Sequence, residues 1–285
     1  ELSYRFREGS RGIAGLRYDN LRTETGTMHA AGEISSVVLS GSNRRRNQDL
    51  WPAFLRYEQR LQQVPLLFAV GIGHAQRGAD YWEVYSYDGF SLDPEMNTEI
   101  DVYALYGGEK WTASLSFFLS HIKDFILTYN GVLAYNIEAE RVGGEGSLSY
   151  RILPELVASA QIAMVYAENR SEGVPLAQTP PLEGTLRLAY ERDLYSLGFS
   201  SRFVDSQERI HADHGNRLAV DTKPTPGFAV LAAEASFTPW QWANLSFGIE
   251  NILDHTYHEH LTRTPSPVPG FVVRENVKEP GRRFW

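Results

Sequence analysis

The sequence contains no cysteine and only three methionines among its 285 residues. Without cysteine, the chain can form neither a disulfide framework nor a thiolate metal site. The formal net charge is -8 at pH 7, so a large basic surface is missing as well. An acidic balance of this size argues against a nucleic-acid partner, because nucleic-acid binding relies on positive surface potential.

Long apolar runs are also absent. The longest, residues 66–72, is far shorter than the roughly 20 residues that a membrane-spanning helix needs. A chain that crosses a membrane with β-strands has the same low hydropathy, because only every second residue of each strand faces lipid. The first residues, ELSYRFREGS, do not form a signal peptide, and we expect the chain to begin in the middle of a larger structure.

Motifs that would indicate catalysis are missing from the sequence. It contains neither a glycine-rich phosphate loop nor a Gly-x-Ser-x-Gly elbow. We therefore expect no enzyme activity and no resident cofactor. A hydrolase built on a barrel is the open alternative, since a catalytic triad need not be visible in a sequence.

Apolar and polar residues alternate along most of the chain. In residues 111–121, WTASLSFFLSH, apolar side chains at odd positions alternate with hydroxyl side chains. The same two-residue period recurs at 99–106, 156–166, 183–191, 195–203 and 244–250. A period of two is typical of β-strands with one apolar and one polar face, and no convincing amphipathic helix accompanies it.

The connections between these strands alternate in length. Short ones fall at residues 7–12, 61–65, 107–110, 153–155, 191–193 and 238–241, and long polar ones at 22–48, 75–97, around 128–142, 168–180, 205–226 and 254–280. This alternation predicts an up-and-down, transmembrane antiparallel β-barrel with tight turns at one rim and large loops at the other. About thirteen strands are expected, the last only begun. Single-chain bacterial barrels have even strand numbers, so the odd count predicts a partial barrel.

Three sets of residues test the membrane interpretation. Aromatic residues flank the short turns and should form an interfacial girdle at one rim: Tyr57, Tyr106, Trp111, Tyr150, Tyr190, Tyr195 and Trp240. The apolar faces should lie together on the convex, lipid-facing side of the sheet: Leu115, Phe117, Ile162, Leu188, Phe199 and Phe247. Charged residues of the opposite face should line the lumen: Asp101, Glu183, Arg187, Arg202 and Glu250. A soluble all-β binding protein, such as a propeller or a paired sandwich, is the alternative.

Histidines and methionines in the long connections are the candidate metal ligands. His211 and His214 occur in HADH, and His255 and His258 in DHTYHEH. Imidazole nitrogens suit copper or zinc, so the connection 254–280 is expected to bring His255 or His258 near His211 or His214. The adjacent Met28 and His29 offer softer ligands for cuprous ion. The competing interpretation is that these side chains are solvated or bonded to nearby carboxylates.

Four segments resemble TonB-dependent outer-membrane receptors. LDPEMNTEIDVYALY (92–106) resembles a segment that opens a late barrel strand, and NIEAERVGGEGSLSYRI (136–152) is similar to a later strand. GIENILDHTYHEHL (248–261) and EPGRRFW (279–285) resemble the segments near the family's C-terminus. Three stretches are most similar to the copper receptor branch, namely residues 79–85, residues 168–184 and TYHEHL (256–261) with EPGRRFW (279–285).

The resemblance implies a 22-stranded barrel with short periplasmic turns and long extracellular loops, filled by an N-terminal plug domain. Residues 1–285 would be its C-terminal portion, without the plug, the early strands and the end of the last strand. The implied function is uptake of a scarce metal, copper first and a siderophore or cobalamin complex as alternatives, across the outer membrane of a Gram-negative bacterium. The implied partners are membrane lipid, the plug and the TonB system of the inner membrane. The basic run NRRRN (43–47) offers guanidinium groups to the phosphates of lipopolysaccharide, or is a solvated loop tip.

Overall fold

The computed structural model describes residues 1–25, 44–86, 89–130, 133–216, 219–262 and 277–285. The regular elements of this part of the chain are β1 (Leu2–Arg7), β2 (Ser10–Leu16), β3 (Asp19–Thr25), β4 (Arg44–Leu50), β5 (Ala53–Arg60), β6 (Leu66–Arg77), α1 (Tyr81–Ser86), η1 (Gly89–Ser91), β7 (Glu95–Gly107), β8 (Trp111–Tyr129), β9 (Leu133–Leu153), β10 (Leu156–Asn169), β11 (Val174–Pro175), β12 (Glu183–Glu191), β13 (Tyr195–Val204), β14 (His214–Gly215), β15 (Phe228–Trp240), β16 (Ala243–Glu250) and β17 (Arg283–Phe284). No helix in these ranges has the length and apolar character that a membrane crossing requires.

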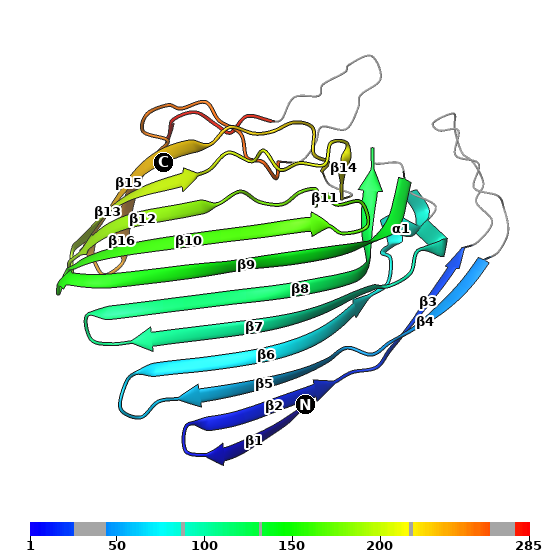
Figure 1. Ribbon diagram of the computed structural model, residues 1–285. Coiled ribbons are helices and arrows are strands. Elements are labelled where there is room, and N and C mark those ends of the chain that lie inside the picture. The colour runs from blue at the N-terminus through cyan, green and yellow to red at the C-terminus, as the bar shows by residue number, and fades with distance from the viewer. Residues whose placement is uncertain (26–43, 87–88, 131–132, 217–218, 263–276) are drawn as a thin grey trace.

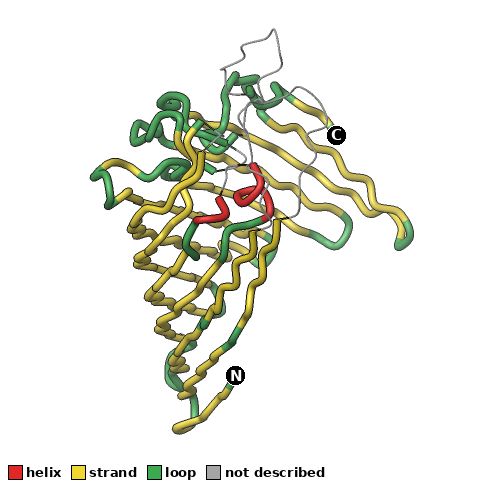
Figure 2. The backbone as a smooth tube through the Cα atoms, turned by 90° about the vertical axis from the view of Figure 1, so that its right-hand side faces the viewer, coloured by secondary structure: helices red, strands yellow, loops and turns green. Residues whose placement is uncertain are grey.

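One curved antiparallel sheet dominates the molecule (Figure 1). It has 15 strands, of which β11 and β14 pair off the main path, so thirteen described strands follow one another from β1 to β17. The curve stays open between β1 and β17 (Figure 2). The expected all-β, partial barrel of about thirteen strands is confirmed.

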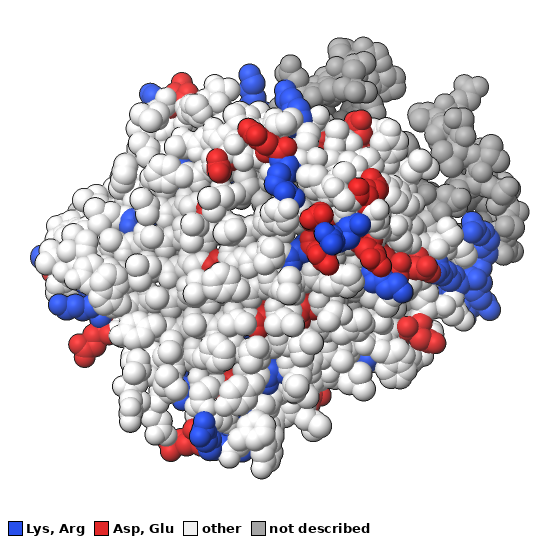
Figure 3. Space-filling view, in the orientation of Figure 1, with Lys and Arg blue, Asp and Glu red and all other residues white. Residues whose placement is uncertain are grey.

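The apolar faces of the strands gather on the convex side of the sheet. Leu115 is in register with Gly146, which is in register with Ile162, and Leu188 lies directly opposite Phe199. Leu115, Phe117, Ile162, Leu188, Phe199 and Phe247 are all exposed. Figure 3 shows this face as a broad expanse with few charged atoms, and most charged side chains gather toward its edges. The large apolar surface is what lipid contact requires and what water disfavours.

The predicted aromatic girdle lies at the rim of short turns. Trp111 and Tyr150 are cross-strand partners on β8 and β9, with ring centroids 4.1 Å apart. The ring centroids of Tyr190 and Tyr195 lie 6.0 Å apart across the β12–β13 turn. Trp240 stacks on Trp242 at the β15–β16 turn. Tyr57 lies farther from the short turn along β5 than the other rings. Its side chain extends toward the turn, because its hydroxyl donates to the amide oxygen of Gln59, which is nearer the turn. The rings therefore form a band at one rim.

The predicted long loop around 128–142 is wrong because regular structure occupies it, and strands extend into both ends of the predicted connection 22–48. Strand β8 continues to Tyr129 and β9 starts at Leu133, so the loop expected around 128–142 is a tall hairpin. Its upper part stays extended because Leu127 and Ile137 pack with Leu176 of the β10–β12 connection in a small apolar core. Strands β3 and β4 pair as a separate two-stranded sheet that includes residues 22–25 and 44–48 of the predicted connection, while residues 26–43 lie outside the described residues. The run NRRRN therefore lies largely in β4 rather than at a loop tip.

The connection 75–97 contains the short helix α1, which the sequence pattern did not predict. Asp80 and Glu83 cap it reciprocally, each carboxylate accepting the backbone N–H of the other residue, at 2.8 and 2.7 Å. Arg77 holds Glu83 at 2.8 Å and Glu95 at 2.8 Å, which fixes the helix to β7. Figure 2 shows α1 and η1 on the inner side of the curve.

Candidate functional site

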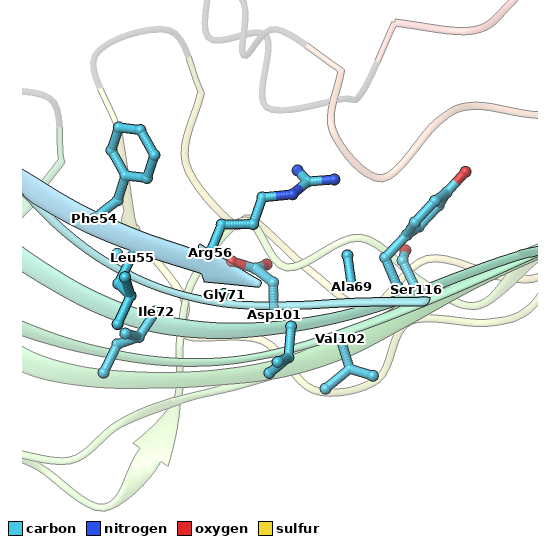
Figure 4. Close-up of a pocket in the computed structure, with 12 residues that line it drawn as sticks. Phe54, Leu55, Arg56, Ala69, Gly71, Ile72, Asp101, Val102 and Ser116 are labelled. Atoms are coloured by element: carbon cyan, nitrogen blue, oxygen red, sulfur yellow. The ribbon is translucent and has the colours of Figure 1, made fainter. Parts of the chain in front are cut away.

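The concave face of the sheet is a polar wall. Along β5, Phe54 and Arg56 point to the concave side and Leu55 points away, as Figure 4 shows together with Asp101 on the same side as Arg56. Strand β6 adds small residues here, so a hollow opens between the side chains of β5 and β7. The alternation that exposes apolar groups to lipid therefore leaves the polar groups facing the lumen.

Ion pairs between neighbouring strands cover part of this wall. Arg202 of β13 binds Glu183 of β12 through two hydrogen bonds of 2.9 and 2.7 Å. Arg187 pairs with Glu234, and Glu250 with Arg283. The register places Asp101, Glu183, Arg187, Arg202 and Glu250 opposite the apolar face, as predicted.

Two carboxylates of the wall have no cationic partner among the described residues. Asp101 makes no hydrogen bond or ion pair there, and Glu145 accepts only a hydrogen bond from the Ser116 hydroxyl, at 3.3 Å. Both side chains are exposed to the lumen. Unpaired carboxylates on a concave wall attract cationic groups, whether of a protein segment or of a solute.

At the rim opposite the short turns, three connections converge on Asp221. The Asp221 side chain is fully buried. One carboxylate oxygen accepts the backbone N–H and the side-chain amide of Gln178, at 3.1 and 2.8 Å, and the other accepts the backbone N–H of His211 at 2.9 Å. Nε2 of His260 lies 3.5 Å from the first oxygen.

In the same cluster, His260 lies between Asp221 and Thr225 and contacts both. Nδ1 of His260 lies 3.1 Å from the Thr225 hydroxyl, while Nε2 faces Asp221. A catalytic nucleophile must reach its substrate, and Thr225 and His260 are both buried. The arrangement therefore holds two connections together and does not present a reactive hydroxyl.

His211 and His214 lie side by side. Their rings stack with centroids 3.6 Å apart and an interplanar angle of 19°. His214 Nδ1 contacts the carbonyl of Ala212 at 2.8 Å, and His211 Nε2 lies 3.5 Å from a carboxylate oxygen of Glu172. Ring nitrogen lone pairs lie in the ring plane, so two nearly parallel rings do not aim at one metal ion.

The other candidate ligands do not join this pair. His255 is exposed and donates its backbone N–H to the Asn251 side chain. His258 lies beside Lys223, His260 and Lys278 rather than beside His211 or His214. Met28 and His29 lie outside the described residues. Within the described ranges, no group of three or more His, Asp or Glu side chains has an arrangement that would hold a metal ion.

Sequence reasoning missed Asp221 and did not connect Glu259 with Arg202. Glu259 lies in the connection after β16 and binds Arg202 at 2.5 and 3.2 Å, so Arg202 holds two carboxylates. Asp221 is a single acidic residue in a polar stretch, VDTKP, where nothing in the local pattern marks it as buried. The only signal in the sequence is that these connections contain lysine, glutamate and aspartate residues, which can form ion pairs.

Acidification should weaken the cluster around His211. Burial and the neighbouring His214 lower the pKa of His211 below its ordinary 6.5, so the folded state favours the neutral ring. The unfolded chain binds the proton more readily, and stability should fall as pH drops below about 6.5. Burial would raise the pKa of Asp221, but His260 at 3.5 Å and the hydrogen bonds from His211 and Gln178 outweigh it and lower the pKa, which adds a second loss below about pH 4.

The measurement is thermal unfolding of the detergent-solubilised protein at pH 7.5 and 5.5. We expect a lower unfolding temperature at pH 5.5 and a smaller difference in His211→Gln, which has no titrating ring. An equal pH difference in wild type and variant would contradict the role of His211.

A sequence model of the family "TonB dependent receptor-like, beta-barrel" matches residues 1–252. The chain belongs to this family. Proteins of the TonB-dependent family are receptors and transporters of the outer membrane of Gram-negative bacteria. A comparison with curated protein sequences found no significant match.

Among solved structures, the TonB-dependent barrel resembles the "Copper transporter OprC" with a TM-score of 0.91 and 32% identity. The match covers 99% of this chain and 45% of OprC, so the chain spans less than half of that protein's length. The ferric-catecholate import receptor Fiu from E. coli K12 matches with a TM-score of 0.68 and 14% identity over 98% of this chain and 42% of Fiu. The FrpB iron transporter from Neisseria meningitidis matches with a TM-score of 0.70 and 18% identity over 96% of this chain and 42% of FrpB. The last two likenesses concern the fold.

Proposed function

We propose that residues 1–285 are the C-terminal barrel portion of an outer-membrane receptor that takes up copper. The similarity to OprC supports this proposal most strongly, because it extends over 99% of the chain at 32% identity, whereas the iron receptors share only 14–18%. A siderophore or cobalamin complex is the alternative cargo.

The lumen wall supports a protein partner inside the barrel. Asp101 and Glu145 are unpaired carboxylates among the described residues, and ion pairs with arginine or lysine of a plug domain would satisfy both. Contacts of this kind hold a domain in place and still break under load, because each is exposed to water and individually weak. We propose that the plug is part of the same receptor and that the TonB system pulls on it.

The outer surface supports a membrane partner. The uncharged convex face and the aromatic rim match the hydrocarbon layer and one interface of a bilayer, which supports location in the outer membrane (Figure 3). Lipopolysaccharide is the proposed partner of the basic run 43–47, since Arg44 and Arg45 are exposed on β4. Arg46 has another role, because it donates to the backbone carbonyls of Phe90 and Leu92 and pairs with Asp93.

Copper accumulation by cells tests the proposal. The full-length receptor is expressed in a Gram-negative strain that lacks its own copy, at limiting copper, and cell copper is measured with and without TonB. We expect severalfold more copper only when both receptor and TonB are present. Unchanged copper together with faster uptake of a ferric siderophore or of cobalamin would replace copper by that cargo.

Copper titration of the purified receptor in detergent tests the candidate ligands separately. The compared variants are His211→Ala/His214→Ala/His255→Ala/His258→Ala and Met28→Leu/His29→Ala. Because the stacked His211 and His214 rings do not converge, we expect the four-histidine variant to keep wild-type stoichiometry and affinity. Loss of one bound copper in either variant would assign a metal site to those loops.

A further inference from the structure

We propose that a hollow on the convex face of the sheet, together with the β12–β13 turn at the adjacent rim, binds one phospholipid whose headgroup carries both a phosphate and a primary ammonium. An acyl chain of this lipid lies in the hollow, and the headgroup lies at the turn. Figure 1 shows β9, β10 and β12, which form the hollow, as neighbours in the sheet. The inference rests on the proposed location in a membrane and does not depend on the cargo.

Two alanines of β10 form the floor of the hollow. Ala158 and Ala160 lie on the convex face, because they are directly opposite Leu188 and Leu186 of β12. Larger side chains flank them on both neighbouring strands: Leu148 and Tyr150 on β9, and Leu186 and Leu188 on β12. With Phe199 of β13, these side chains surround a hollow of about 400 Å³ whose exposed lining is almost entirely apolar. Such a hollow suits a hydrocarbon chain, which restores the dispersion contacts that the two small residues leave unmade.

The hollow lies close to the rim of short turns. Ala160 follows Leu156 by four positions, and Leu156 is directly opposite the rim residue Tyr190. Four positions correspond to about 14 Å along the strand at ~3.4 Å per residue. With a strand tilt of about 40°, the hollow lies within about 10 Å of the rim, in the nearer half of an apolar band ~25 Å tall. A chain that fills it therefore belongs to a lipid of that leaflet, whose headgroup lies at the short turns.

The β12–β13 turn carries a phosphate-binding side chain beside this rim. Arg192 follows Leu188 by four positions, and its Nε donates to the Tyr190 hydroxyl at 3.0 Å. One terminal nitrogen lies 3.3 Å from a carboxylate oxygen of Glu155, and the other makes no hydrogen bond within the described part of the chain. The Arg192 side chain is 54% exposed. A guanidinium offers several N–H donors in one plane, so Arg192 still has donors for the oxygens of a phosphate.

Carboxylates beside Arg192 select the other half of the headgroup. Glu155 faces Arg192 with one oxygen, and its side chain is 34% exposed. Asp193, the next residue of the turn, is exposed as well. An exposed ion pair is weak, so exchanging the Arg192–Glu155 contact for contacts with a phosphate and an ammonium costs little. A primary ammonium has three N–H donors for these carboxylates, whereas a quaternary ammonium has none and a glycerol headgroup brings no positive charge.

Native mass spectrometry of the full-length receptor tests the site. The receptor is released from nanodiscs that contain equal amounts of dioleoyl phosphatidylethanolamine, phosphatidylcholine and phosphatidylglycerol, and the lipid that stays bound is identified. We expect phosphatidylethanolamine to be retained roughly fivefold more often than either other lipid. Equal retention of the three lipids would overturn the proposal. A receptor that enters no bilayer would contradict the membrane location as well as the site.

Substitutions on the convex face locate the retained lipid. Ala158→Leu/Ala160→Leu fills the hollow and should remove most of the retention. Ala104→Leu/Ala235→Leu is the matched control, because these alanines lie on the same face, opposite Leu115 and Phe247, and outside the hollow. Glu155→Gln keeps the hollow and the guanidinium, and we expect it to lose most of the preference for phosphatidylethanolamine over phosphatidylcholine. Equal retention in the filled variant and its control would show that the lipid binds elsewhere, and the proposal would be wrong.

Discussion

Phe117→Arg is expected to prevent most of the receptor from assembling in the membrane. Phe117 lies on the convex face and is 53% exposed. It follows the rim residue Trp111 by six positions in β8, which corresponds to about 20 Å along the strand at ~3.4 Å per residue. With a strand tilt of about 40°, the residue lies about 15 Å above the rim, near the middle of an apolar band ~25 Å tall. Arginine at that depth costs about 2–4 kcal/mol.

The neighbouring Ser116 is the matched control for this substitution. It lies on the lumen face, where its hydroxyl donates to Glu145, so Ser116→Arg adds charge to a polar, water-accessible wall. The measurement is the heat-modifiable, folded fraction of full-length receptor in outer-membrane extracts. We expect a severe loss for Phe117→Arg and little change for Ser116→Arg. Equal effects, or the reverse order, would mean that the convex face does not contact lipid.

Arg202→Met should free the connection after β16 and destabilise the receptor by about 1–2 kcal/mol. Arg202 is the shared partner of Glu183 and Glu259, and all three side chains are about one-third exposed, which limits the effect. Without the guanidinium, two carboxylates face each other with no compensating charge. Methionine keeps much of the side-chain length, so loss of packing contributes little.

Thermal unfolding and limited proteolysis of residues 251–262 measure this effect. Arg187→Met is the control, because Arg187 also lies on the lumen face but holds only Glu234. We expect a fall of roughly 2–4 °C in unfolding temperature and faster cleavage after β16 for Arg202→Met alone. Adding Glu183→Gln and Glu259→Gln removes the repulsion and should restore stability. Failure of the triple variant to recover would attribute the loss to packing rather than charge.

The sheet was predictable because its information is local. A strand in a membrane barrel has one lipid face and one water face, so every second side chain is apolar, and residues such as Leu115 and Phe117 could be assigned to a face from the letters alone. Turn lengths gave the up-and-down order, and the aromatic residues beside the short turns marked one interface. None of these three predictions requires knowledge of contacts between residues that are distant in the sequence.

The ends of the strands were harder to predict, because contacts between residues distant in the sequence decide where a strand ends. Above the membrane, β8 and β9 no longer need a continuous apolar face, and the polar letters of residues 128–142 suggested a loop. Contact of Leu127 and Ile137 with Leu176, which is distant in the chain, keeps this hairpin extended. The β3–β4 hairpin is likewise stabilised by a long-range contact, that of Arg46 with the carbonyl of Phe90 in η1. Helix α1, in contrast, is capped locally by Asp80 and Glu83.

The sequence by itself determined the fold class, the two faces of the sheet and the rim of aromatic residues. Only the tertiary structure decided which side chains meet at the mouth: Asp221 with Gln178 and His260, and Glu259 with Arg202. The physical reason is distance along the chain. Alternation within a strand follows from backbone geometry, whereas the burial of one carboxylate depends on three connections that arrive from different strands.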